Sequence, residues 1–245
     1  MNQIKILAPL EIFQQIKAHF TQKQFPIKLA QATSKENDFA DISIQGSTLK
    51  LHNGDDSLVH PLWDENFHRQ LQENQKTPLK KSLGKNPEKL SILDATGGFF
   101  CDALQMSRLC HKVLSCEVNP LLYCAAEISK ISDLQSQFVA DFYSKHSIEF
   151  KYHNAFHFSK KTPSAFNSVY IDPMFEHNNA ALPKKKMQFL REIAENEELV
   201  ELKELALKSL SIQRMIIKKS SQDEKSKNSS HIYEGKGHFF EVFIL

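Results

Sequence analysis

The sequence predicts an α/β fold built around a parallel sheet, and three observations lead to this expectation. From Leu90 onward, short apolar runs typical of strands alternate with stretches of helical pattern, as in doubly wound sheets. Three of these runs end in an acidic residue, at Asp94, Glu117 and Asp172. The third run, in residues 168–175 (SVYIDPMF), is followed at once by a proline, which cannot donate to a strand ladder. We therefore expect the three acids to border one crevice at the carboxyl edge of the sheet.

The composition is that of an ordinary soluble globular protein. The chain has 245 residues, of which 41% are hydrophobic and 24% charged. No apolar run approaches the roughly 20 residues needed to cross a bilayer. The first residues also lack the apolar segment and cleavage site of a signal peptide. We expect a cytoplasmic protein with no membrane partner.

Residues 1–60 are predicted to form a small α+β subdomain that precedes a larger α/β domain at 61–245. Residues 4–7 read as a strand and 10–20 as an amphipathic helix. The alternating segments 40–44 and 48–51 surround Gln45-Gly46-Ser47 and predict a hairpin. Nothing in this subdomain suggests chemistry, so we expect it to pack or to orient a substrate.

The larger domain is predicted to contain five strands in its parallel part and a closing antiparallel pair. Asn119 and Pro120 have the residue types of an N-cap and a first helical position. The expected strands are 91–94, 113–117, 148–152, 169–171 and 215–218, followed by the pair 231–233 and 238–245. The expected helices are 99–109, 119–131, one ending before 146, and those within 182–210.

The four cysteines all fall between Cys101 and Cys124. Their spacings match no zinc pattern and include no CxxC pair, although a metal cluster is a conceivable alternative. Free and largely buried thiols in a reducing compartment are the preferred interpretation, and no metal is expected.

The net charge is only +2, but the lysines are unevenly distributed. Short basic runs can hold a phosphate backbone or can simply be solvated faces, so charge permits a nucleic-acid partner without requiring one. The basic residues considered for RNA contact are Lys184, Lys185, Lys186, Lys218, Lys236 and His238.

The first two acidic strand ends suggest an adenosine-binding site. In dinucleotide-binding folds, the acid that binds the ribose lies roughly 20 residues after the glycine turn, and Glu117 lies at about this separation from Asp94. Gly97 and Gly98 in that turn let a ligand approach the backbone. Because the turn is no GxGxxG fingerprint, a dinucleotide is not expected, and the smaller S-adenosylmethionine suits the arrangement better.

Six blocks of the chain resemble the ribosomal small-subunit methyltransferase J family, in an order and spacing that cover nearly the whole sequence. The DPMF block with its trailing lysines is the most specific and the glycine turn the least. The blocks are 94–98 (DATGG) with Asp102 and Ala103, 117–120 (EVNP), 170–175 (YIDPMF), 180–187 (AALPKKKM), 214–218 (RMIIK) and 236–241 (KGHFFE).

The resemblance implies a class I methyltransferase, with a Rossmann-like sheet and a small N-terminal α+β subdomain, that uses S-adenosylmethionine. It implies methylation of the exocyclic N2 amine of guanine 1516 in 16S rRNA. The expected partner is therefore 16S rRNA or the small ribosomal subunit; which of the two is the substrate, and the oligomeric state, stay open.

The resemblance and the glycine turn together define a predicted cofactor site. This chain departs from the family at Cys101, where arginine is usual, at Asn154-Ala155, where a serine pair is usual, and at Phe100, where a second glycine is usual. Residues 70–75 also lack the family's glycines. The predicted cofactor-binding residues are Asp94, Gly97, Gly98, Cys101, Asp102, Glu117, Val118, Asn154, Ala155 and Asp172.

The predicted catalytic residues are Asp172, Pro173 and Phe175. The guanine amine is a poor nucleophile because its lone pair is delocalised into the ring. Hydrogen bonds from its N–H groups to the Asp172 carboxylate and the Pro173 carbonyl would orient that lone pair toward the methyl group. Phe175 would stack on the base, a contact worth roughly 1–3 kcal/mol.

Simpler interpretations remain open for several of these residues. Asp172-Pro173 is a common turn sequence, Glu117 could cap the following helix, and Asp102 could be a solvated helix residue. His238 could be structural. For the whole chain, one alternative is a degenerate family member that binds RNA without catalysis, suggested by Phe100 and the missing glycines. Another is methylation of a different amine, in DNA or protein.

Overall fold

The computed structural model describes residues 3–33, 40–46, 48–54, 56–72, 77–131, 134, 136–155, 166–173 and 212–245. These residues group into two compact units. The first contains the described residues up to 72 together with 119–145, and the second contains those of 73–118, 146–180 and 194–245. The predicted division of the chain at residue 60 stays a prediction.

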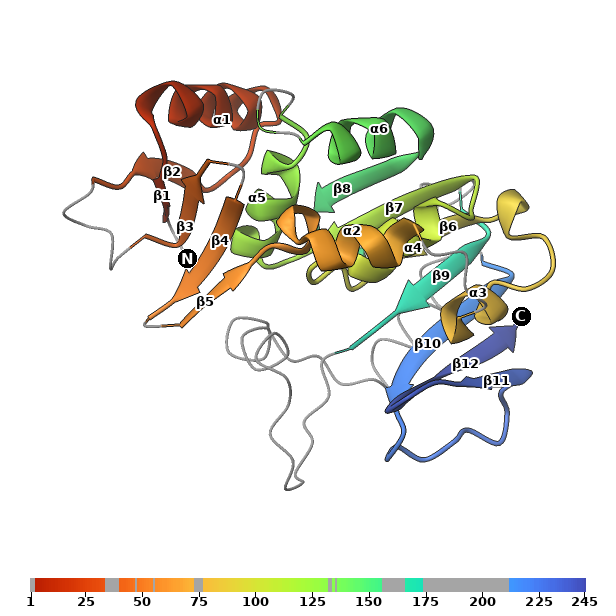
Figure 1. The fold of residues 1–245 in the computed structure, drawn as a ribbon. Helices are drawn as coiled ribbons and strands as arrows, with labels where there is room; N and C mark the ends of the chain where they lie inside the picture. The colour runs from red at the N-terminus through yellow and green to blue at the C-terminus, as the bar shows by residue number, and fades with distance from the viewer. Residues whose placement is uncertain are drawn as a thin grey trace. The chain divides into compact units, whose positions relative to one another are not determined.

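The first unit has a five-stranded mixed sheet (Figure 1). Its strands in spatial order are β2 (Lys28–Gln31), β1 (Gln3–Leu7), β3 (Ile42–Gln45), β4 (Thr48–Asn53) and β5 (Asp56–Val59). Strand β1 is parallel to β2 and β3, whereas β3, β4 and β5 are antiparallel. The predicted first strand and the hairpin are confirmed. The edge strands β2 and β5 were not predicted.

Helices complete the first unit. Helix α1 (Leu10–Gln22), the predicted amphipathic helix, buries Phe13, Ile16 and Phe20. The 3-10 turn η2 (Pro61–Trp63) precedes α2 (Glu65–Gln72), and α5 (Pro120–Ile128) and α6 (Gln137–Lys145) follow later in the chain. Asn119 caps α5 as predicted, because its side-chain oxygen accepts the N–H groups of Leu121 and Leu122 at 2.9 and 3.2 Å.

The second unit is a seven-stranded sheet, which confirms the expected α/β architecture. Its strands in spatial order are β11 (His231–Glu234), β12 (His238–Ile244), β10 (Arg214–Ser220), β9 (Ser168–Ile171), β6 (Ser91–Asp94), β7 (Lys112–Glu117) and β8 (Ile148–Tyr152). The five strands from β10 to β8 are parallel, and β12 and β11 are the predicted antiparallel pair. Helices α3 (Pro78–Ser82) and α4 (Cys101–Ser107) and the 3-10 turn η3 (Pro87–Lys89) also belong to this unit.

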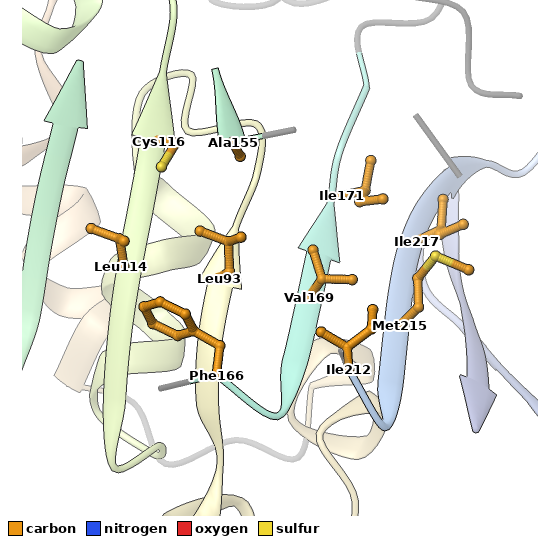
Figure 2. Close-up of a cluster of buried hydrophobic side chains, with 10 residues drawn as sticks. All are labelled: Leu93, Leu114, Cys116, Ala155, Phe166, Val169, Ile171, Ile212, Met215 and Ile217. Carbon is orange, nitrogen blue, oxygen red and sulfur yellow. The ribbon is translucent and has the colours of Figure 1, made fainter. Parts of the chain in front are cut away.

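One face of this sheet carries a continuous apolar cluster. Leu93, Val169, Met215 and Leu114 come from four neighbouring strands and lie side by side (Figure 2). Because side chains alternate between faces along a strand, the residues between them point to the other face. That other face presents polar groups at the carboxyl ends of the strands, where the candidate site lies.

Several element boundaries differ from the sequence prediction. Helix α4 begins at Cys101, not at residue 99, because Phe100 has a left-handed φ of 58° that cannot belong to the helix. Strand β10 continues to Ser220, where it pairs with His238 of β12. The helices predicted within 182–210 lie outside the described residues. Among the residues that the structure describes, no helix has the length and apolar character needed to cross a membrane.

Candidate functional site

The turn after β6 is held in place by Asp94, which is only 1% exposed. The Ser115 hydroxyl donates to one of its carboxylate oxygens at 2.5 Å, and the Thr96 N–H donates to the other at 3.2 Å. Burial raises the pKa of Asp94 to about 7, although both hydrogen bonds act in the opposite direction. Asp94 therefore holds the turn through these two hydrogen bonds, and its buried carboxylate is not accessible to a ligand.

The two glycines of this turn are required for different reasons. A Cβ on Gly97 would lie 2.6 Å from the Phe100 ring and 3.0 Å from the Cys116 carbonyl oxygen, so no larger residue fits. The Gly97 N–H donates to that same carbonyl at 2.8 Å, which ties the turn to β7. Gly98 has a φ of 53°, and a Cβ there would find its nearest atom, the Thr96 carbonyl oxygen, at 4.0 Å. A side chain would therefore clash at position 97, whereas the space next to Gly98 is open.

Glu117 at the end of β7 faces this turn. One of its carboxylate oxygens accepts the Gly98 N–H at 2.6 Å, and Glu117 is 8% exposed. The alternative role of capping the next helix is taken by Asn119. Val118, the next residue, is an exposed apolar side chain at 36%.

These groups fit the adenosine part of the cofactor expected from the sequence. A carboxylate has two oxygens with about four acceptor positions, enough to hold Gly98 and to accept ribose hydroxyls. Val118 offers an apolar surface for a flat base, and the open side of Gly98 admits a ligand close to the backbone. Glu117, Val118 and Gly98 would therefore hold this part of S-adenosylmethionine.

A second cluster lies at the end of β9, where Asp172 meets Asp102 of α4 and Lys218 of β10. The Lys218 ammonium donates to Asp102 Oδ2 at 2.7 Å and to Asp172 Oδ2 at 2.9 Å. The Tyr170 hydroxyl also donates to Asp102 Oδ2, at 2.6 Å. Asp102 is therefore not the solvated helix residue of the simpler interpretation. We call Asp102, Asp172 and Lys218 the carboxylate–lysine cluster.

The two carboxylates of the carboxylate–lysine cluster have opposite pKa shifts. Burial acts to raise the pKa of Asp102, but the Lys218 charge and the hydrogen bonds from Lys218 and Tyr170 outweigh it, and the pKa is lowered. Burial raises the pKa of Asp172, and repulsion by Asp102 adds to this effect while Lys218 opposes it. Asp102 is the better-stabilised anion because it has two donors. Burial and the nearby carboxylates also raise the pKa of the Tyr170 hydroxyl, which therefore stays a donor.

Two hydrogen bonds join the glycine turn to the carboxylate–lysine cluster. The Asp172 N–H donates to the Thr96 hydroxyl at 2.6 Å, and the Ala95 N–H donates to the Tyr170 carbonyl at 2.9 Å. Parallel strands end at a common edge, so the turn after β6 and the acid after β9 are neighbours. The structure thus brings together Asp94, Gly98, Glu117, Asp102 and Asp172.

The remaining predicted residues are more scattered. Cys101 is a partly exposed cysteine at the start of α4 that forms no disulfide. Asn154 is partly buried after β8, and Ala155 packs at 1% exposure in the apolar cluster of Figure 2. Pro173 is buried.

The residues predicted to contact RNA have varied settings. His238 packs edge to face on Phe240, with ring centroids 5.2 Å apart, and burial together with the Lys218 charge lowers its pKa. Lys236 is exposed. The Lys218 ammonium is engaged by the two carboxylates instead of extending into solvent. Phe175 and the lysines at 184–186 lie outside the described residues.

Sequence reasoning missed three supporting residues, Thr96, Ser115 and Tyr170. Tyr170 carried a usable signal, since it lies two residues before Asp172 on the same strand face. Ser115 likewise lies opposite Asp94 in the register of β6 and β7. Thr96 had no such signal, because its bond to the Asp172 N–H spans 76 residues of sequence.

Comparison with known proteins identifies related methyltransferases. The chain is 24% identical over 221 residues to the ribosomal RNA small subunit methyltransferase J of Francisella philomiragia, covering 82% of this chain and 86% of that protein. It is 29% identical over 152 residues to the protein of the same name from Alcanivorax borkumensis, covering 58% and 55% respectively. The fold matches the crystal structure of a SAM-dependent methyltransferase from Neisseria gonorrhoeae with a TM-score of 0.62 at 18% identity, over 99% of this chain and 95% of that one.

The fold is therefore that of a class I methyltransferase with a Rossmann-like sheet. The family model described as "Putative SAM-dependent methyltransferase" matches residues 26–245, which is most of the sequence. The chain thus belongs to this family of SAM-dependent methyltransferases, and S-adenosylmethionine is its cofactor.

Proposed function

We propose that this enzyme methylates the exocyclic N2 amine of a guanine in 16S rRNA, in the cytoplasm, and that guanine 1516 is the target. The curated relatives carry the name ribosomal RNA small subunit methyltransferase J, which supports an rRNA substrate. The DPMF block, residues 172–175, resembles the corresponding block of the ribosomal small-subunit methyltransferase J family, and this resemblance supports the guanine amine as the methyl acceptor.

The observation that carries this proposal is the position of Asp172 at the carboxyl end of β9. Its backbone N–H is fixed by Thr96, and its Oδ2 is fixed by Lys218. The side chain is 32% exposed, so its other oxygen can reach a ligand at the sheet edge. A carboxylate followed at once by the Pro173 carbonyl gives two acceptors for the two N–H groups of one flat amine.

In this mechanism the chain's own residues bind and orient the amine. Asp172 and the Pro173 carbonyl accept its two hydrogens, which directs the nitrogen lone pair away from both acceptors. The bound cofactor supplies an electrophilic methyl group on a positively charged sulfonium. Asp172 also stabilises the positive charge that develops on the nitrogen, and the surplus proton can leave to solvent afterwards. Positioning of this kind accounts for several kcal/mol of barrier lowering.

The RNA would be held by residues outside the carboxylate–lysine cluster. Lys236 lies in the turn between β11 and β12, and His238 is the first residue of β12, the strand that pairs with β10. Lys184, Lys185 and Lys186 follow the DPMF block in sequence, and we propose that they contact phosphates. Phe175 would stack on the target base.

Methyl incorporation into 16S rRNA and into 30S subunits from a strain lacking the activity tests the proposal. We expect wild-type enzyme to label one of them at a single guanine N2, located by mass mapping of nuclease fragments. Asp172→Ala and Asp172→Asn should lose about 100-fold or more in rate, since a misplaced nucleophile costs about that much. Lys85→Met, at an exposed loop position of the same unit, is the matched control and should label normally.

Each alternative function gives a different result in this experiment. Equal labelling by wild type and Asp172→Ala would remove the role assigned to Asp172. Cofactor binding without methyl transfer to any RNA would indicate a degenerate member of the family. Methyl transfer to a DNA or protein amine, with the RNA unlabelled, would replace the substrate but retain the site.

A further inference from the structure

Lys218 occupies the centre of the candidate site, and its position follows from the alternation of strand residues. Met215 and Ile217 of β10 point into the apolar cluster of Figure 2. Lys218 therefore points to the opposite face, as does Phe240, its register partner on β12. On β9, next to β10, Ile171 also belongs to the apolar cluster, so Asp172 falls on the side of Lys218.

The surroundings of Lys218 are those of a structural cation and not of a solvent-exposed phosphate contact. Its side chain is 25% exposed, and its ammonium lies within 2.9 Å of carboxylate oxygens from two other elements. A phosphate contact would require Lys218 to leave both carboxylates. Burial acts to lower the pKa of Lys218, but the two carboxylates raise it overall, so the group stays an ammonium and cannot serve as a base.

We propose that Lys218 is a positioning residue that keeps Asp172 an ionised, acceptor-only carboxylate and directs its second oxygen toward the substrate amine. This inference rests on the proposed function, because it assigns Lys218 a part in orienting that amine. It replaces the phosphate contact expected for Lys218 from the sequence with a role inside the site.

The need for such a residue follows from the chemistry of the carboxylates. An ionised carboxylate only accepts hydrogen bonds, whereas a protonated one presents an O–H donor that would oppose the N–H groups of the amine. Asp102 and Asp172 share one ammonium, so without it two partly buried anions would face each other. Asp102 keeps its hydrogen bond from Tyr170, which makes Asp172 the one that takes up a proton.

Other titratable groups also face this cluster and enter the interpretation. Asp94 on β6 and Tyr170 on β9 interact electrostatically with both carboxylates, and His238 on β12 interacts with Lys218 and Asp102. The pKa of Asp94 is raised mainly by burial, and Asp102 and Asp172 add to this effect. The pKa of His238 is lowered by burial, and the Lys218 charge contributes to lowering it.

The test compares Lys218→Met with Lys218→Arg, using the methyl-transfer rate at saturating substrates from pH 5.5 to 9. We expect the acid limb of the Lys218→Met profile to move upward by about one to three pH units, the range in which an opposite charge shifts a neighbouring carboxylate. Lys218→Arg retains the charge and should keep its limb near that of wild type. If the double variant Lys218→Met with His238→Gln shows the same shift of the acid limb, His238 is excluded as the titrating group.

Salt dependence distinguishes positioning from RNA binding. If Lys218 positions Asp172, the slope of log KM for RNA against log salt stays the same in Lys218→Met. A lost phosphate contact would instead reduce that slope by about one. A uniform loss of rate at every pH, or a reduced salt slope, would overturn the proposal.

A measurement independent of activity separates failure of this inference from failure of the proposed function. We expect the loss of unfolding free energy in Lys218→Met to be larger at pH 8 than at pH 5, because protonation of Asp172 relieves the unpaired charge at low pH. In an Asp172→Asn background this pH dependence should be much reduced. A loss that does not vary with pH would contradict the assigned role of Lys218, whatever the enzyme methylates.

Discussion

At the scale of single residues, the site depends on contacts between positions far apart in the sequence. The acids at 94, 117 and 172 were predictable because each ends an apolar run before a turn. The partners of these acids were not predictable, since Lys218 is separated from Asp102 by 116 residues. Strand alternation assigns Lys218 to a face of the sheet, but a lysine on a strand is equally compatible with solvent. The structure shows that it meets Asp172, because the register of β10 and β9 ends with Ile217 opposite Ile171 and the Lys218 ammonium then donates to Asp172.

Asp94 makes the stability of the protein depend on pH. Its folded-state pKa of about 7 lies above the unfolded value of about 3.9, so the folded protein holds this proton more tightly. The stabilisation is fully present below the unfolded pKa and is lost as pH rises through the folded pKa. Relative to Asp94→Asn, which does not titrate, we expect the wild-type unfolding free energy to fall by about 3 kcal/mol between pH 5 and pH 8.

Urea unfolding at several pH values measures this difference. Ser115→Ala is an informative companion, because the Ser115 hydroxyl bond lowers the pKa of Asp94 and its loss should extend the decline to higher pH. Parallel stability profiles for wild type and Asp94→Asn would show that the acid is already ionised at pH 5.

At the scale of elements, the predicted strands and helices agree best where the apolar pattern is long and the ends carry clear signals. Helix α5 is an example, with Asn119 and Pro120 at its start. Strand β2 was missed because it has only four residues, none of them fully buried, at the edge of its sheet. The start of α4 was placed too early because sequence patterns do not reveal that Phe100 adopts a left-handed conformation.

A buried ion pair joins Lys219, near the end of β10, to Glu241 in the middle of β12, and we expect its disruption to be costly. Lys219 Nζ lies 3.2 Å from Glu241 Oε2 and also donates to the Glu224 carbonyl at 2.7 Å. Glu241 is fully buried and also accepts the Ser226 N–H. Lys219→Met should therefore cost about 3–5 kcal/mol of unfolding free energy, because it leaves a buried charge without its cation.

Lys225 provides a matched control for this experiment, since it forms an ion pair with Glu234 that is exposed to solvent. Lys225→Met should change the unfolding free energy by about 1 kcal/mol or less. The double variant Lys219→Met with Glu241→Leu should recover much of the loss, because no charge then remains buried. A double variant as unstable as Lys219→Met would attribute the loss to packing of the lysine stem.

At the scale of the whole molecule, the chain passes repeatedly between the two units. The insertion of α5 and α6 between β7 and β8 connects the five-stranded unit to the seven-stranded one. The sequence predicted an α/β domain preceded by a small subdomain. It gave no indication that residues 119–145, which follow the pattern of crossover helices, group with the N-terminal strands. Periodicity identifies a helix but does not determine which sheet it covers.

This connectivity predicts that cofactor binding stabilises both units together. The groups proposed to hold the adenosine, Gly98 and Glu117, lie in the second unit, whereas Trp63, the single tryptophan, lies in the first. The segment that carries α5 and α6 is continuous in sequence with the end of β7 and the start of β8, so unfolding of these two strands would release both ends of the segment. At a cofactor concentration 100 times Kd, we expect about 2.7 kcal/mol of added stability in the tryptophan signal as well as in circular dichroism.

Urea unfolding followed by both signals, with and without S-adenosylmethionine, measures this coupling. Glu117→Gln should reduce the cofactor-induced shift in both signals, because an amide cannot accept two hydroxyl hydrogens and the Gly98 N–H as a carboxylate does. Coincident transitions support a single cooperative unit. A circular dichroism transition that moves with cofactor while the Trp63 transition stays in place would show instead that the two units unfold separately, with the cofactor stabilising only the one that contains Glu117.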